Sequence, residues 1–181
     1  MAESPFVQQG FTRLGTVYSD GTGSIAGTFT SLSPVFDTYV LDVSGLITKT
    51  QNDSVVVQFG VGTGPTWGST NYSWMMQTFL DTSSTASNTF NSAAVGVNLG
   101  ICDTTASTCL TACVTIKNMQ SSTLFKTVNG EGQVSSGTSF ATNNLNGVWH
   151  NSTTPVTAIR IAAVTGSVAS GAAISLYGVM V

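Results

Sequence analysis

Cysteine and histidine are the residue types in this chain that could hold a soft metal ion or form a covalent cross-link. The sequence has three cysteines, Cys102, Cys109 and Cys113, and one histidine, His150. A tetrahedral zinc site needs four such ligands, so we expect no metal and no other cofactor. Two states of the cysteines stay open: a loop disulfide from Cys102 to Cys109, or three reduced thiols buried as small apolar residues. The second is favoured, because the chain shows no export signal and the cytoplasm keeps thiols reduced.

A serine and a histidine raise the question of nucleophilic catalysis. The run Gly-Thr-Ser-Phe-Ala-Thr at 137–142 resembles the segment that carries the attacking serine in subtilisin-like proteases. In those enzymes the aspartate and the histidine both precede the serine, whereas His150 follows Ser139. The chain also lacks the alternating helices and strands of that fold. We expect Ser139 and His150 to be catalytically idle, although a serine, histidine and acid in another geometry stay open in principle.

Carboxylates and glycine-rich loops give no stronger sign of an enzyme. Glycosidases use a pair of carboxylates, but most of the eight acidic residues here lie in turn-like or terminal contexts. The loop Gly60-Val-Gly-Thr-Gly-Pro65 has the glycines of a phosphate-binding loop without the helix that must follow them. The sequence therefore predicts no enzyme and no catalytic residue.

Aromatic side chains provide the only binding signal, because their rings stack on sugars and anchor protein interfaces. The candidate binding residues are Trp67, Tyr72, Trp149 and His150. Core packing is the competing explanation, and it is favoured for Trp74, Phe79 and Trp149 on expected strands. The loop around Trp67 is rich in Gly, Thr and Pro, which predicts an exposed indole or one at a contact between subunits.

Composition limits both the elements that position these residues and the partners they can meet. The 181 residues include 23 Ser, 28 Thr and 19 Gly, but only 5 Lys and Arg and 8 Asp and Glu. Such a chain is poor in the residues that fill long helices, and it has no basic cluster for nucleic-acid phosphates. No apolar stretch is long enough to span a bilayer as a helix. We therefore expect a neutral surface, no nucleic-acid partner and no membrane insertion.

Short runs of alternating apolar and polar residues predict an all-β fold, an antiparallel β-sandwich. The expected strands are 15–18, 25–30, 38–43, 54–59, 72–79, 94–99, 113–117, 123–128, 148–150, 158–163 and 173–179. The expected turns are 19–23, 51–53, 60–68, 146–147, 165–167 and, most sharply, a type I′ hairpin turn at Asn129-Gly130. Residues 81–92 are expected to be a surface loop. Residues 1–24 are assigned to an N-terminal arm and first strand, and residues 25–181 to a single sandwich domain whose last strand lies inside the sheet.

Two stretches of the chain resemble small jelly-roll modules on the virions of tailed bacteriophages. One comprises the run from His150 to Ile161 and the run from Gly166 to Val179, in which the ending Ser175-Leu-Tyr-Gly178 is the most specific part. The other, from Asp53 to Trp74, is similar to the central portion of these modules. Modules of this kind decorate heads or form parts of tail fibres and spikes, and they are usually trimeric and without catalysis.

The resemblance implies a homotrimeric virion protein that contacts itself and other virion proteins and is made in the host cytoplasm without a signal peptide. The low charge agrees with this, because neutral β surfaces can be buried against copies without desolvating ions. The function expected is capsid decoration or cementing, or a place in an appendage. The alternative is a tail fibre or tailspike module that binds a host surface glycan.

Overall fold

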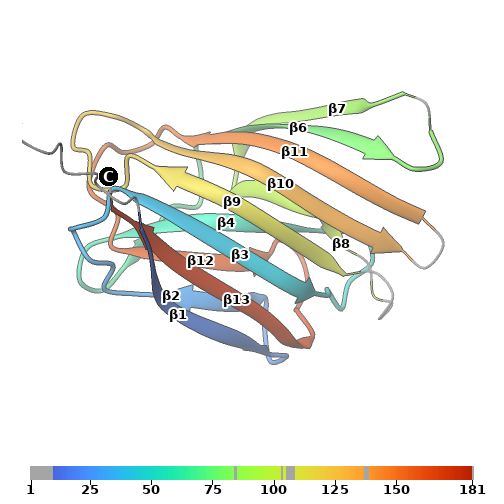
Figure 1. The fold of residues 1–181 in the computed structure, drawn as a ribbon, viewed down its shortest axis with the longest axis horizontal. Helices are drawn as coiled ribbons and strands as arrows, with labels where there is room; N and C mark the ends of the chain where they lie inside the picture. Colours follow the sequence, from blue (N-terminus) through green and yellow to red (C-terminus); the bar gives the residue numbers. More distant parts are fainter. Residues whose placement is uncertain (1–9, 84, 103, 105–108, 137–138, 181) are drawn as a thin grey trace, which may run out of the picture.

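The computed structural model describes residues 10–83, 85–102, 104, 109–136 and 139–180. Within these ranges every regular element is a β-strand, and none is a helix that could cross a membrane. The strands form two antiparallel sheets packed face to face (Figure 1). This confirms the predicted all-β class and the antiparallel sandwich arrangement.

The larger sheet has eight strands, and the smaller sheet has four with a fifth attached. The larger has the order β1 (Phe11–Asp20), β13 (Ser170–Val179), β3 (Thr38–Leu46), β9 (Leu110–Lys117), β10 (Lys126–Ser136), β11 (Ser139–Trp149), β6 (Tyr72–Leu80) and β7 (Ser87–Ala94). The smaller has the order β2 (Ile25–Phe29), β12 (Ala158–Ala163), β4 (Asp53–Val61) and β5 (Thr66–Trp67), and β8 (Val97–Cys102) also pairs with β4. Because β13 lies between β1 and β3, the prediction of an interior C-terminal strand is confirmed.

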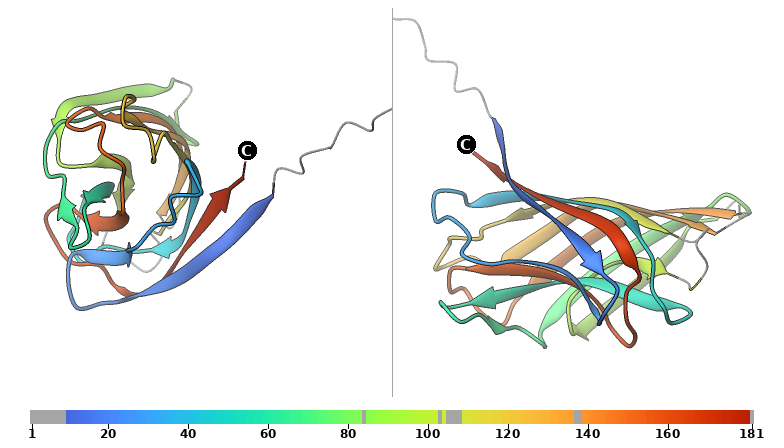
Figure 2. Two further views of the ribbon diagram at one scale, coloured as in Figure 1. Left: turned by 90° about the vertical axis from the view of Figure 1, so that its left-hand side faces the viewer. Right: turned by 90° about the horizontal axis from the view of Figure 1, so that it is seen from below.

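The two sheets curl around one core, and β1 with the end of β13 reaches out from the body (Figure 2). Period-2 alternation decides which side chains enter this core. On β3, Tyr39, Leu41 and Val43 are fully buried, and Asp42 between them points to the outer face. The first strand predicted for residues 15–18 is longer and begins at Phe11, whereas residues 1–9 of the predicted N-terminal arm lie outside the described residues.

The predicted hairpin turn at Asn129-Gly130 is wrong. Both residues lie in the middle of β10, paired with β9 on one side and β11 on the other, and neither has a positive φ. The glycine is required for a different reason: a Cβ atom at Gly130 would overlap the backbone carbonyl oxygen of Cys113 on β9. The predicted turn at 146–147 is wrong in the same way, since both residues lie within β11. Pairing on both sides overrides the local turn preference of Asn-Gly.

The predicted loop at 81–92 is also partly wrong, because β7 occupies its second half. This edge strand pairs with β6 in a register that places Phe90 opposite Met75. Every side chain from Ser87 to Ala93 is exposed. With no buried face, the strand has no apolar alternation by which the sequence could have shown it.

Candidate functional site

Two of the four candidate binding residues, Tyr72 and Trp149, lie in the core. They are cross-strand partners on β6 and β11, and their rings stack with centroids 5.7 Å apart. Phe59 of the smaller sheet closes the cluster at 6.0 Å from Tyr72 and 5.8 Å from Trp149. Both candidates are at most 2% exposed, so neither can reach a ligand or a partner. Their assignment as binding residues is corrected to a structural role.

The hydroxyl of Tyr72 has its own structural task. It accepts a hydrogen bond of 2.8 Å from the backbone N–H of Phe59. Phe59 lies on β4 between the stretch paired with β8, which ends at Val57, and the stretch paired with β5, which begins at Gly60. The Tyr72 side chain thus satisfies a buried donor at a gap in the ladder. Burial also raises the pKa of this phenol well above its usual range.

His150, the third candidate, lies directly after β11 and is half-buried. Its Nε2 atom is 3.0 Å from the Ser73 Oγ atom, and its ring meets Phe125 edge to face at 6.4 Å. Ser139 is the first residue of β11, and Trp149, which precedes His150, is the last. The ten residue steps of extended strand between these two positions span roughly 33 Å. His150 therefore cannot take a proton from Ser139, and residues 137–138 of the protease-like run lie outside the described residues.

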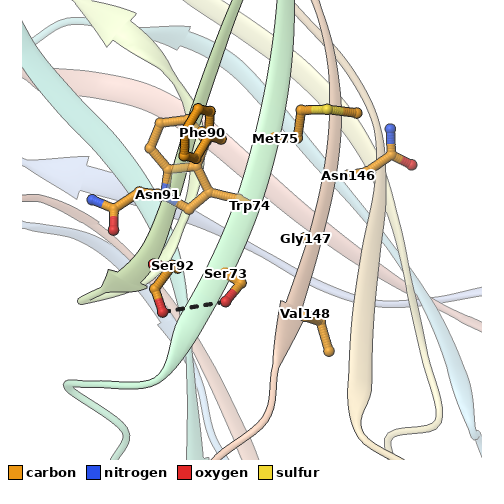
Figure 3. A pocket seen from close by; sticks show the side chains of 9 residues that line it. All are labelled: Ser73, Trp74, Met75, Phe90, Asn91, Ser92, Asn146, Gly147 and Val148. Atoms are coloured by element: carbon orange, nitrogen blue, oxygen red, sulfur yellow. Dashed lines mark hydrogen bonds between the residues drawn. The ribbon is translucent and has the colours of Figure 1, made fainter.

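The contact between Ser73 and His150 deserves comparison with a catalytic pair, because a nucleophile needs a base within such a distance. The Ser73 hydroxyl also lies 3.3 Å from the carbonyl oxygen of Ser92, to which it can donate, as Figure 3 shows, so a backbone acceptor competes with the imidazole for the serine proton. In the described part of the chain no carboxylate is hydrogen-bonded to His150 to orient the ring. The pair lacks the third member that a triad requires.

Trp67, the fourth candidate, lies on the short strand β5 and is half-buried rather than fully exposed. The guanidinium carbon of Arg160 lies 4.5 Å from the ring centroid, a cation–π distance. The indole also packs closely on β4, where a Cβ atom at Gly60 would lie 3.2 Å from the ring. Trp67 thus holds an arginine of its own subunit, a role that the sequence did not indicate.

Arg160 is fixed by a second contact as well. Its Nε atom donates to the Gln58 Oε1 atom at 2.7 Å, and the Gln58 amide donates to the Val95 carbonyl at 2.7 Å. These contacts place a half-buried guanidinium on the outer face of the smaller sheet. Burial lowers the pKa of this guanidinium from its usual value, and the side chain stays charged at neutral pH.

A cavity of about 460 Å³ opens on the larger sheet between β6, β7 and β11 (Figure 3). Its lining residues are Ser73, Trp74, Met75, Phe90, Asn91, Ser92, Asn146, Gly147 and Val148. Phe90 is 80% exposed and Met75 is 53% exposed, so the cavity is flanked by apolar side chains open to solvent. The sequence did not point to Phe90, because it lies in a stretch that reads as a polar loop.

The three cysteines are free thiols in different surroundings. Cys102 is buried and Cys109 is half-buried, but Cys113 lies on the outer face of β9 and is exposed. The prediction that all three are buried is therefore wrong for Cys113. Among the described residues no three His, Cys, Asp or Glu side chains form a group that could hold a metal ion.

Comparison of the chain with known protein families, with curated proteins and with solved structures gave no match. The chemistry of the surface must therefore be judged from its own geometry. That geometry combines an apolar cavity on one sheet, a fixed arginine on the other and a serine–histidine contact without an orienting acid.

Proposed function

We propose that this protein is a non-enzymatic structural component of a tailed-bacteriophage virion, a jelly-roll subunit that assembles as a homotrimer. Its role would be capsid decoration or cementing, or a place in an appendage. The resemblance of the stretch from His150 to Ile161 and of the ending Ser175 to Gly178 supports the virion setting. The surface described above supports assembly with copies and with other virion proteins.

The observation that carries the proposal is the apolar outer face around β6 and β7. Phe90 and Met75 stand side by side on it as cross-strand partners. The outer edge of β7 carries no strand in the described structure, and β7 contains neither a charged residue nor a proline. Natural proteins usually protect such an edge, because it can pair with another chain. A contact with another subunit would cover both the edge and the apolar pair.

Sedimentation velocity on the wild type and on Phe90→Ser tests this surface. We expect the wild type to associate and the variant to associate at least tenfold more weakly, since a large exposed aromatic anchor is lost. Phe11→Ser is the matched control, because Phe11 is 67% exposed at the opposite edge of the same sheet. Equal association of all three chains would contradict this assembly surface.

Imaging of virions that carry the protein is a second test of the proposed function. It should place the protein on the head or the tail in groups of three.

A host glycan is the second candidate partner, and the cavity in Figure 3 favours it specifically. Phe90 of β7 offers a ring and Asn146 of β11 offers an amide on the same outer face, beside Met75, which together suit the apolar face and hydroxyls of a sugar. If this is the function, the wild type should bind members of an array of bacterial surface glycans, and Asn146→Ala should lose that binding. Absence of any binding by the wild type would leave the structural function alone.

A further inference from the structure

We infer that one copy of this protein binds the next through the outer faces of its two sheets, with Arg160 of one copy paired to Glu131 and Asp42 of its neighbour. The inference rests on the proposed assembly of copies and names the surfaces that meet. It makes the contact heterologous, since two different faces of the chain are used.

Arg160 provides the cationic half of this contact. Trp67 lies against its guanidinium and Gln58 accepts from its Nε atom, so the side chain is held in one place before any partner arrives. No carboxylate of the described residues pairs with it. A half-buried charge without a counter-ion is costly, and a bound carboxylate would offset that cost through two parallel hydrogen bonds.

Asp42 and Glu131 provide the anionic half. Both are cross-strand partners of Cys113, one on β3 and the other on β10, so they flank that thiol on the outer face of the larger sheet. Their charges raise the pKa of the Cys113 thiol, although burial is the larger cause. Neither acid forms an ion pair with a described residue. The sheet therefore presents two like charges about 10 Å apart, neither of them paired to a cation among the described residues.

Apolar side chains accompany each charge at a similar spacing. On the larger sheet, Met75 of β6 lies two strands from Glu131 and two residues along the strand from its level, or about 12 Å away. On the smaller sheet, β8 also lies two strands from Arg160, and Val95 comes just before it. Val95 is 40% exposed and shares a groove of about 280 Å³ with Arg160. Pairing the charges therefore brings apolar surface on both copies together.

A second copy suits this surface better than an acidic glycan does. The face of Trp67 is already covered by the Arg160 guanidinium, so no ring is free beside the cation to stack on a sugar. The chain itself supplies the complementary carboxylates. Because the outer faces of the two packed sheets point in opposite directions, this contact repeats as a row of copies, so it joins one trimer to the next rather than closing the trimer itself.

Charge reversal tests the pairing. The chains to compare are wild type, Arg160→Glu, the double variant Asp42→Lys with Glu131→Lys, and the control Lys49→Glu. Lys49 is exposed and bonds the Gly21 carbonyl, away from both faces. Circular dichroism first establishes that each chain keeps its β-sheet. The two acids are on the surface, so their double variant is testable even if Arg160→Glu does not fold.

In sedimentation equilibrium we expect each reversed chain to raise the dissociation constant about tenfold or more, and Lys49→Glu to leave it unchanged. A mixture of the two reversed chains should associate again, because each then offers the charge that the other lacks. The inference is overturned if the wild type associates and the reversed chains associate equally well, which would leave the proposed function intact. It is also overturned if Arg160→Glu loses binding to an acidic polysaccharide while its self-association is unchanged. A wild type that never associates would refute the proposed assembly as well.

Discussion

Removing one oxygen atom from the core, in Tyr72→Phe, tests the role assigned to the buried aromatic cluster. The phenyl ring of the variant can keep its stacking on Trp149, so packing changes little. The backbone N–H of Phe59 loses the hydroxyl that accepts from it at 2.8 Å, and Phe59 is fully buried. A buried donor left without a partner costs about 1–3 kcal/mol.

For a domain of this size, 1 kcal/mol corresponds to about 2–4 °C in Tm, so Tyr72→Phe should lower Tm by roughly 2–12 °C. Thermal unfolding followed by circular dichroism measures this shift. Tyr18→Phe is the control, because Tyr18 is 69% exposed and its loss should change stability by less than about 0.5 kcal/mol. If Tyr72→Phe melts with the wild type, the hydroxyl does not hold the gap in the β4 ladder. If it instead weakens association without loss of stability, Tyr72 is a binding residue after all.

Three further results are expected. Asp53 is 2% exposed and accepts from the backbone N–H groups of Thr165 and Gly166, so Asp53→Ala should lower the free energy of unfolding by about 2 kcal/mol in urea titrations, and Asp53→Asn by less. Burial raises the pKa of both Tyr39 and Cys102 to about 12, from usual values of 10.0 and 9.0. The stability that these neutral groups contribute to the folded state is therefore fully present below about pH 9 and is lost as pH rises to about 12. The urea midpoint should therefore fall over this window and fall less steeply in Cys102→Ala, and a midpoint that rises with pH would contradict the sign. Ser73→Ala and His150→Gln should leave the protein without any change in ester or glycan hydrolysis, and a wild-type hydrolase activity that disappears in either variant would show an enzyme.

The sequence was informative where a strand has one buried face. On β3 and β13 alternation alone indicates which side chains enter the core, and Leu41, Ile174 and Leu176 do so without exposure. It failed at Gly130, where a local dipeptide preference competes with pairing to two neighbouring strands. It failed again at β7, because an exposed edge strand buries no side chain and leaves no periodic pattern to detect.

The candidate site was predictable only by residue type. The sequence singled out aromatic residues, but residue type alone cannot tell a ring that faces the core from one that faces the surface. Tyr72 and Trp149 lie on the inner face, whereas Phe90, which the sequence did not suggest, is the exposed ring. The contact of Arg160 with Trp67 joins β12 to β5 across 93 positions of the chain, and no local pattern encodes it.

The mass of the purified protein in solution tests the proposed assembly most directly. Size-exclusion chromatography with multi-angle light scattering, run over a range of micromolar loading concentrations, gives that mass without reference to shape. The proposed homotrimer predicts a species of three times the 18.7 kDa of one chain, populated more fully as concentration rises. A constant mass of one chain at every concentration would contradict it.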